Sequence, residues 1–369
     1  MAHVQKRNGK WQARYRAPDG RERTKRFDRK VDAERWLDLN GADLARHQWV
    51  DPRLGKVTFR AWSEQWTSTT VANRPSTRAR DASCLRTHVL PMFGDREIGG
   101  ITHIEVRAWV AELSTRKAPA TVHKAFQIMA KILDSAVDGG LIPSNPCSRV
   151  PLPRVEHEEM RYLTPVQVAA LADAIHPRYR ALVLVGAYGG LRIGELAGLR
   201  RGRVDVLRNR IEVAEIVVEV SGHLTFGPPK TRAGRRSITL PRSVASALDD
   251  HLASFTPADP QAFVFTAPEG GPLRVPTWRR RAWKPAVEKA ELTPLRPHDL
   301  RHTAVALWIA SGANPLEVSR RAGHTSTSFT QDRYGHLFPE ADSELAERLE
   351  AFASARSSGA GSTVTALPR

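Results

Sequence analysis

The chain has few cysteines, no long apolar run and no apolar leader, and each shortage excludes a class of protein. Two cysteines in 369 residues, Cys84 and Cys147, exclude a disulfide framework and a thiolate-rich metal site and fit a reducing compartment. The longest strongly apolar stretch, near residues 181–191, is too short and too broken by glycine to span a membrane. Residues 1–26 are polar and basic, without the apolar core of an export signal. We therefore expect a soluble cytoplasmic protein with no membrane partner.

The charge of the chain is strongly positive. Lys and Arg number 56 and Asp and Glu number 39, which gives a net charge of +17. With 41% hydrophobic and 26% charged residues, the chain is expected to fold into two or three domains and not to be disordered. The positive excess favours a polyanionic partner, most simply nucleic acid. Because arginine dominates the basic residues, genome composition is an alternative source of this charge.

Residues 1–53 have the pattern of a separate basic module. Val4–Arg16 and Arg21–Phe27 read as strands joined by a Pro-Asp-Gly turn, and a helix is expected from Lys30 to about His47. Such a sheet on a helix can lay its strands in a major groove; the alternative is a solvated basic surface. The candidate DNA-binding residues are Lys6, Arg7, Lys10, Arg14, Arg16, Arg21, Arg23 and Lys25.

Residues 57–142 read as a helical block. Phe59, Trp62 and Trp66 recur at helical spacing, which favours a role in the core over base stacking. A Gly-Gly pair at 139–140 is expected to stop the last helix. Four prolines between 143 and 153 then predict a stiff linker over residues 143–160.

Residues 161–338 read as a third, mixed domain. Thr164 and Pro165 predict a helix start. A β-hairpin region is expected between groups of helices, with one strand at Arg210–Val220, followed by Ser221-Gly222, and a second at Arg236–Leu240. Residues 339–369 are expected to form a short amphipathic helix and a loose tail. The expected fold class is thus multidomain and mainly α, with small β elements: an N-terminal three-stranded sheet plus helix, a helical domain and a mixed α/β domain.

Two short motifs each place an arginine beside a second polar side chain. Arg192 follows a Gly-Gly break at an expected helix start, and helix periodicity puts Glu195 on the same face. That arrangement suits a phosphate site, although an ordinary surface ion pair has the same pattern. His298 and Arg301 share a helical turn, which supplies an imidazole beside a second guanidinium. His298 and His302 also have metal-ligand spacing, but no Glu follows the first His, so we expect no metal site.

The remaining motifs carry a phenol and an ammonium. His324 and Tyr334 are ten residues apart, and Lys230 lies between the two expected strands. A phenol with a pKa of about 10 needs cationic neighbours or a base to react near neutrality. The alternatives are a packed tyrosine with a satisfied hydroxyl and a solvated loop lysine.

Together these residues resemble the active-site series of the tyrosine recombinases, the phage integrase family. The segments GLRIGEL (190–196), PPKTRAGRR (228–236), HDLRHT (298–303) and YGHL (334–337) are similar to the family's motifs. Ala322 stands before Gly323 and His324 where the family more often has Leu, so a packing change is expected. The resemblance covers essentially the whole chain. It implies an arm-type DNA-binding domain (1–53), a helical core-binding domain (57–142) and a catalytic domain (161–338).

The resemblance also implies a mechanism. Tyr334 would attack a scissile DNA phosphate and form a 3′-phosphotyrosyl link. Arg192 and Arg301 would hold the phosphate oxygens, and Lys230 would protonate the leaving 5′ oxygen. The expected supporting residues are Glu195, which orients the basic cluster, His298, which handles a proton, and His324, which hydrogen-bonds the phosphate. The phosphotyrosyl ester keeps the bond energy for rejoining, so no ATP, metal or other cofactor is expected.

The implied partners are double-stranded DNA at core and arm sites, a homotetramer on DNA, and an accessory DNA-bending or directionality protein. The C-terminal segment would dock on its own domain or on a neighbouring subunit. Three other functions remain open from the sequence: a noncatalytic DNA-binding regulator with a helix-turn-helix near residues 311–323, a nicking and closing topoisomerase, and a host-type dimer-resolving recombinase. The separate N-terminal module favours an integrase over the last of these.

Overall fold

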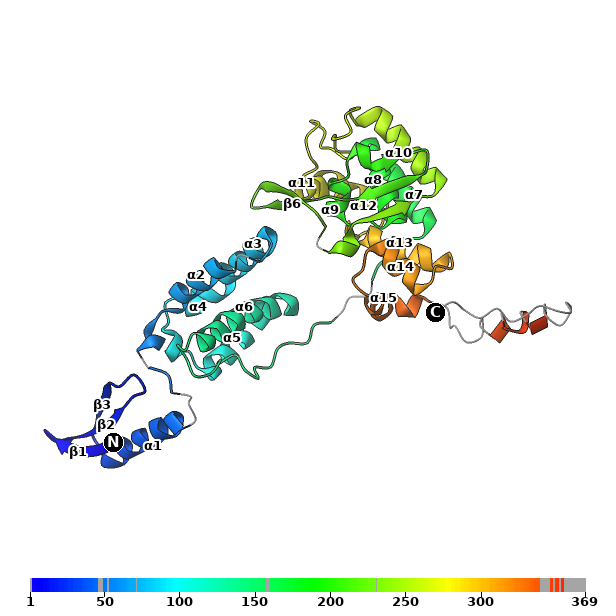
Figure 1. Ribbon diagram of the computed structural model, residues 1–369. Coiled ribbons are helices and arrows are strands. Elements are labelled where there is room, and N and C mark those ends of the chain that lie inside the picture. The colour runs from blue at the N-terminus through cyan, green and yellow to red at the C-terminus, as the bar shows by residue number, and fades with distance from the viewer. Residues whose placement is uncertain are drawn as a thin grey trace. The chain divides into compact units, whose positions relative to one another are not determined.

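The computed structural model describes residues 2–45, 49–51, 53–70, 72–156, 160–229 and 231–338, with short pieces at 346–347, 349–351 and 353–354. The chain divides into two compact units, Met1–His157 and Glu158–Arg369 (Figure 1). Both consist mainly of helices with small antiparallel sheets, which confirms the expected fold class. No helix in these described ranges is long and apolar enough to cross a bilayer.

The first unit begins with a three-stranded antiparallel sheet in the order β1-β2-β3. The expected three-stranded sheet is confirmed, but the span Val4–Arg16, which was expected as one strand, is a hairpin of two strands. Asn8 and Gly9 have φ values of 47° and 75°, the conformation that a two-residue Asn-Gly turn requires. The elements are β1 (His3–Arg7), β2 (Lys10–Arg16), β3 (Glu22–Phe27) and α1 (Lys30–Ala45). The expected helix end at His47 lies outside the described residues.

Helix α1 covers one face of this sheet. The ring of Trp36 on α1 lies 5.2 Å from the ring of Tyr15 on β2 and 6.0 Å from that of Phe27 on β3. Ala13, on the same face of β2 as Tyr15, is fully buried. The other face of the sheet therefore remains uncovered by α1.

The helical block of the first unit is built around buried aromatic and aliphatic side chains. Trp109 donates its indole N–H to the carbonyl of His88, and Trp62 donates to Ser135. These contacts confirm that the tryptophans belong to the core. Gly140, with φ of 68°, follows the end of the last helix. The elements are η1 (Leu54–Lys56), α2 (Phe59–Thr69), α3 (Pro75–Cys84), η2 (Leu85–Val89), α4 (Leu90–Phe93), η3 (Ile98–Gly100), α5 (His103–Arg116) and α6 (Pro119–Asp138).

The second unit opens at the expected helix start. The Thr164 hydroxyl accepts a hydrogen bond from the backbone N–H of Gln167, and the Gln167 side chain accepts one from the backbone N–H of Thr164, with Pro165 in the first turn. The first helices are α7 (Pro165–Ala174), η4 (Pro177–Tyr179), α8 (Arg180–Gly189), α9 (Ile193–Ala197) and η5 (Arg201–Arg203). The later helices are α10 (Arg242–Phe255), α11 (Val275–Trp278), η7 (Arg279–Trp283), α12 (Lys284–Lys289), α13 (Asp299–Ala310), α14 (Pro315–Ala322), α15 (Thr327–Tyr334) and η8 (Gly335–Leu337).

The strands of the second unit differ from the expected pair. Arg210–Val220 is divided into β5 (Arg210–Val213) and β6 (Ile216–Val220). Strand β5 pairs with β8 (Arg236–Thr239), as the expected hairpin region implies, and also with β4 (Val204–Asp205). Strand β6 forms a second hairpin with β7 (His223–Gly227), a strand that was not expected. The short helix η6 (Arg232–Gly234) precedes β8. Lys230 lies outside the described residues, as does much of the expected helix over residues 339–354.

The centre of the second unit is the contact between α8 and α13. Helix α8 is apolar on nearly every side and ends at Gly190, which has φ of 67°. Trp308 of α13 donates its indole N–H to the carbonyl of Tyr188. A Cβ atom at position 190 would lie 2.5 Å from the Trp308 ring. Only glycine therefore fits both the backbone conformation and the space at this position.

Replacing Gly190 with Ala should strongly destabilise the chain. The left-handed conformation alone costs a residue with Cβ about 1–2 kcal/mol, and the collision with Trp308 adds about 1–3 kcal/mol of overpacking. Gly222→Ala is the matched control, because Gly222 has φ of 80° but no atom within 4 Å of the added Cβ. Thermal unfolding of the full chain should show the larger loss for Gly190→Ala, and equal losses would contradict the steric argument.

Candidate active site

Arg301 lies in the first turn of α13 and is anchored by backbone carbonyls from two other helix ends. Its Nη1 donates to the carbonyl of Gly190 at 2.7 Å, and its Nη2 donates to the carbonyl of Ala322 at 2.6 Å. The residue is 3% exposed. Burial, followed by the charges of Arg192 and Arg236, lowers the pKa of Arg301 to about 9. It therefore remains a cation at neutral pH.

Glu195 is a buried carboxylate held between two arginines. Its side chain is 1% exposed and lies 2.9 Å from Arg192 Nη1 and 2.9 Å from Arg236 Nη2. It also accepts the backbone N–H of Arg192 at 2.9 Å. Burial alone would raise the pKa of Glu195, but the charge and hydrogen bonds of Arg236 and those of Arg192 lower it overall. Glu195 is thus ionised and orients two guanidinium groups.

Arg236 is a member of this cluster that the sequence analysis did not select. It stands at the start of β8, its side chain is 6% exposed, and its Nε donates to the carbonyl of Arg321. The segment that contains Lys230 also contains Arg236, but nothing in its spacing distinguishes Arg236 from the neighbouring Arg235. The feature that identifies Arg236 is the buried carboxylate of Glu195, which needs more than one cation to balance it. That burial is visible only in the folded chain.

The imidazole of His302 on α13 lies beside the phenol of Tyr334, and that of His298, the residue before α13, lies beside His302. His302 Nδ1 is 2.6 Å from Tyr334 Oη, and the rings of His298 and His302 are 4.9 Å apart. Burial and the charges of Arg301 and Arg192 lower the pKa of His298. Burial and the charges of His298 and Arg333 lower the pKa of His302 to about 4. Both rings are therefore neutral near pH 7.

His324 covers the other side of the phenol. Its ring is nearly parallel to the Tyr334 ring at 6.3 Å, and its Nδ1 lies 2.8 Å from the hydroxyl of Thr330. Burial and the charges of Arg301 and Arg192 lower the pKa of His324 to about 3. Its Nδ1 is occupied by Thr330, so any further hydrogen bond must be made by Nε2.

Tyr334, the last residue of α15, is 2% exposed. Burial raises the pKa of its phenol, whereas the charges of Arg301 and Arg333 and a hydrogen bond from Arg333 act in the opposite direction. Elements distant in sequence thus converge on one oxygen. The structure brings together Arg192, Glu195, His298, Arg301, His324 and Tyr334 of the expected series. It adds Arg236 and His302.

Comparisons with known proteins agree with this arrangement. Residues 161–341 match the phage integrase family, residues 4–46 match the phage integrase N-terminal domain, and residues 58–151 match the phage integrase central domain. A putative prophage phiRv2 integrase from Mycobacterium tuberculosis is 31% identical over 357 residues, which cover 94% of each chain. The chain belongs to the phage integrase family. It is a site-specific tyrosine recombinase.

Solved structures of integrases have the same fold. The Tn1549 transposon integrase in complex with circular intermediate DNA has a TM-score of 0.68 at 20% identity, covering 79% of this chain and 100% of that one. A lambda integrase tetramer bound to a Holliday junction has a TM-score of 0.57 at 15% identity, covering 88% of this chain and 96% of that one. The sequence-based resemblance to the phage integrase family is therefore confirmed. The reading as a noncatalytic regulator is set aside.

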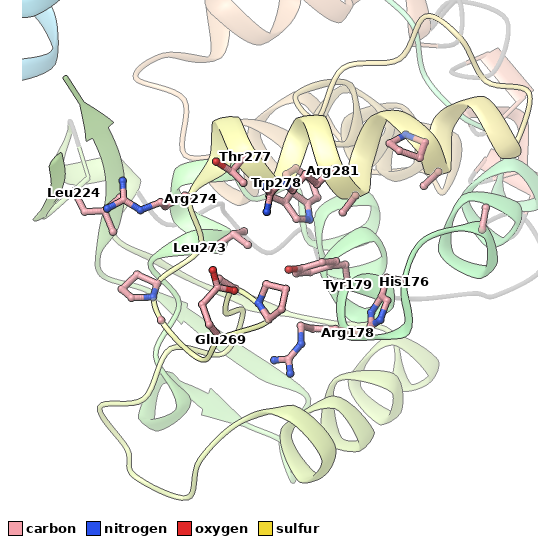
Figure 2. Close-up of a pocket in the computed structure, with 18 of the residues that line it drawn as sticks. His176, Arg178, Tyr179, Leu224, Glu269, Leu273, Arg274, Thr277, Trp278 and Arg281 are labelled. Atoms are coloured by element: carbon pink, nitrogen blue, oxygen red, sulfur yellow. The ribbon is translucent and has the colours of Figure 1, made fainter. Parts of the chain in front are cut away.

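A cavity of about 510 Å³ in the second unit of this integrase lies apart from the arginine cluster (Figure 2). Tyr179 and Trp278 form part of its wall, and its rim carries Arg178, Glu269 and Arg281. None of the expected active-site residues that the structure describes lines it. Over the same described ranges, no group of three His, Cys, Asp or Glu residues is arranged to hold a metal ion.

Replacing Glu195 with Gln should destabilise the integrase, because it leaves Arg236 buried without its counter-charge. Breaking such a buried pair costs about 3–5 kcal/mol. The control is Glu212→Gln, since Glu212 pairs with Arg203 at the surface, where about half of each side chain is exposed; its loss should be about 1 kcal/mol or less.

The difference in stability between the parent and the Glu195→Gln variant should depend on pH, with a sign that the pKa of Glu195 fixes. Because folding lowers the pKa of Glu195, its contribution to stability is present above its ordinary pKa and is lost as the pH falls. Urea unfolding of both variants and the parent at neutral and acidic pH measures it. A Glu195→Gln loss no larger than that of Glu212→Gln would refute the buried pair.

Proposed function

We propose that the chain integrates or excises a phage or other mobile element by cleaving DNA with Tyr334 and rejoining it through a 3′-phosphotyrosyl intermediate. The observation that carries the proposal is the phenolic oxygen of Tyr334, which lies 2.6 Å from a neutral imidazole and within the field of two arginines. A phenol in that setting can attack phosphorus while cations stabilise the charge that develops on the phosphate oxygens.

The two expected arginines would clamp the phosphate from different positions. Arg192 has 43% of its side chain exposed and is held from behind by Glu195. Arg301 uses two of its five N–H donors on carbonyls, which leaves the others for a phosphate. Because Arg301 and Tyr334 are buried, we infer that the residues covering them shift when DNA binds. Replacement of either arginine by Lys would remove the planar fork.

The remaining roles follow from protonation states. A neutral His298 can take up a proton near the nucleophile, and His324 can donate from Nε2 to a phosphate oxygen. Lys230 would protonate the leaving 5′ oxygen, as the family comparison implies. The exchange replaces one phosphate ester by another, so the reaction needs neither ATP nor a metal ion for its energy.

The proposed partners extend to other subunits. The structure of the lambda integrase supports a tetramer, because that protein was solved as a tetramer bound to a Holliday junction. We propose a homotetramer on core DNA, with the N-terminal module on separate arm sites. An accessory DNA-bending or directionality protein and a location on DNA in the bacterial cytoplasm belong to the same proposal.

The uncovered face of the N-terminal sheet supports arm binding. Residues paired across neighbouring strands point to the same face. Arg7 pairs with Lys10, and Gln5 pairs with Gln12, on the face opposite Ala13 and α1. The polar residues of this face are His3, Gln5, Arg7, Lys10, Gln12, Arg14, Arg16, Glu22, Thr24 and Arg26. Gln12 is buried among them, and Glu22 lies 3.6 Å from Arg14. Four expected DNA-binding residues, Arg7, Lys10, Arg14 and Arg16, lie there.

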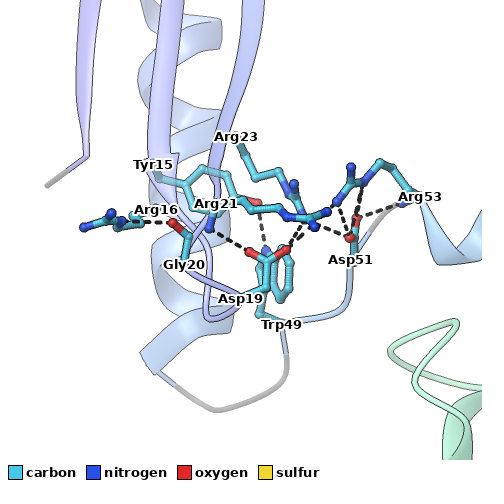
Figure 3. A network of polar contacts seen from close by, with 9 residues as sticks. All are labelled: Tyr15, Arg16, Asp19, Gly20, Arg21, Arg23, Trp49, Asp51 and Arg53. Carbon is cyan, nitrogen blue, oxygen red and sulfur yellow. Dashed lines mark hydrogen bonds and ion pairs between the residues drawn. The ribbon is translucent and has the colours of Figure 1, made fainter.

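Arg23, by contrast, is occupied within the protein. Its Nη2 lies 2.7 Å from Asp19 and 2.7 Å from Asp51, and its side chain is 15% exposed (Figure 3). Hydrogen bonds from Arg53, aided by the charge of Arg23, lower the pKa of Asp51 to about 2. We propose that Arg23 holds the turn against the segment around Asp51. Lys6 and Lys25 share its face of the sheet, and Arg21 lies in the turn before β3.

Replacing Tyr334 with Phe should abolish covalent capture of DNA and leave binding intact. Duplexes selected from a randomised pool by binding to the full chain are rebuilt as nicked suicide substrates, and adducts that survive high salt but not protease are counted. Salt removes noncovalent phosphate contacts. Arg192→Lys and Arg301→Lys should lower the rate by about two to three orders of magnitude. An adduct formed by Tyr334→Phe would exclude Tyr334 as the nucleophile.

Replacing Arg7 with Ala should weaken binding to a mixed-sequence duplex and reduce the slope of log affinity against log salt by about one. Lys25→Ala is the matched control, since it removes the same charge from the opposite face of the same sheet. Fluorescence anisotropy with the full chain at several salt concentrations measures both. Equal effects of the two variants would mean that the open face does not contact DNA.

A further inference from the structure

The hydroxyl of Tyr334 has a partner to which the series of expected catalytic residues gives no role. His302 Nδ1 lies 2.6 Å from Tyr334 Oη, and the two residues are 3% and 2% exposed. The ring centroids are 5.9 Å apart, with an interplanar angle of 48°. A distance of 2.6 Å is short for a hydrogen bond to nitrogen and requires that one of the two groups donates.

The protonation states decide the direction of this hydrogen bond. Burial raises the pKa of the phenol, so Tyr334 carries its proton at neutral pH. The charged and titratable groups that act on His302 are His298, Arg333, Asp299 and Arg296. With burial they leave the imidazole neutral, with a pKa of about 4. A buried hydroxyl needs an acceptor, and the Nδ1 lone pair provides it.

His302 cannot turn away from the phenol easily. On one side of it in α13, Arg301 is tied to the carbonyls of Gly190 and Ala322. On the other side, the Thr303 hydroxyl donates to the carbonyl of Asp299 and accepts the backbone N–H of Leu163. Residues 301–303 are all buried, although they point in different directions around the helix. The hydrogen bonds of Arg301 and Thr303 therefore hold this turn of α13, and with it the Nδ1 acceptor of His302, in place.

We propose that His302 is a further catalytic residue of the strand-transfer reaction, which accepts the hydrogen bond of the Tyr334 hydroxyl and so aims a lone pair of the phenolic oxygen at phosphorus. The inference rests on the proposed function. In the reaction the Oη–P bond forms and the P–O5′ bond breaks. The proton lost by the phenol passes to His298, the proposed proton acceptor, whose ring lies 4.9 Å from that of His302, and the O5′ oxygen gains one from the proposed acid, Lys230.

His302 orients the phenol without acting as its base. Burial lowers the pKa of His302 to about 4 and raises the pKa of the Tyr334 phenol, so full transfer of the proton from the phenol to His302 is unfavourable. The phosphotyrosyl oxygen has no hydrogen, so the hydrogen bond exists before cleavage and after rejoining but not in the covalent intermediate. His302 therefore favours free tyrosine over the intermediate.

The test compares three variants of the full chain on the suicide duplex described above. His302→Asn keeps an acceptor at the position of Nδ1, His302→Gln moves it to the position of Nε2, and His302→Leu removes it. Single-turnover cleavage should fall about 100-fold or more for Leu and Gln, as for loss of one oriented hydrogen bond at a reacting atom, and about 10-fold or less for Asn. His336→Leu, at an exposed site two residues from the nucleophile, should cleave at the parent rate.

A second readout separates chemistry from folding. On an intact duplex the covalent fraction at equilibrium should rise for His302→Leu relative to the parent, because the stabilised free tyrosine is lost. If Leu fails to fold, the Asn and Gln variants, which have similar polarity, carry the comparison. Equal rates for Asn and Gln, or a parent rate for Leu, would overturn the role of His302. If the parent itself forms no adduct through Tyr334, the proposed function fails instead.

Discussion

The second unit depends on the burial of one cation, the guanidinium of Arg301. A buried guanidinium must have its donors satisfied, and here the carbonyls of Gly190 and Ala322 at two helix ends do so. Gly190 and Gly323 adopt left-handed conformations, which end α8 and α14 beside Arg301. The residue that would hold a phosphate thus also joins three helices, so stability and chemistry cannot be varied separately at this position.

The electrostatic balance around this cation remains incomplete within the protein. Arg192, Arg236 and Arg301 share one carboxylate, that of Glu195. The resulting repulsion contributes to the lowered pKa of Arg301 and keeps the nearby histidines neutral. A DNA phosphate would supply the missing negative charge. Binding of DNA should therefore strengthen the protonation of the arginines and relieve the repulsion that folding imposes.

The sequence predicted this site better than it predicted the strands around it. Arg192, His298, Arg301 and Tyr334 could be selected because each stands in a short motif with its own chemistry. Arg236 and His302 could not, since their importance depends on contacts with Glu195 and Tyr334 that only the folded chain makes. The hairpin at Asn8-Gly9 was predictable in principle from its turn sequence. The division of residues 210–220 into two strands was not predictable, because no local feature of the sequence marks the point at which the chain passes from one sheet to the other.

The burial of the nucleophile follows from the same packing. Tyr334 closes the cluster of α13 and α14 residues that includes Val305 and Val318, and its hydroxyl is bonded to His302. The apolar contacts cover the phenol, and the hydrogen bond orients its hydroxyl before a phosphate arrives. In the proposed reaction a phosphate would enter between Arg192 and Arg301, and the cover over the phenol would shift. The positive charge and the packing over the phenol would then act in sequence, because binding of DNA would supply the free energy that exposes the proposed nucleophile.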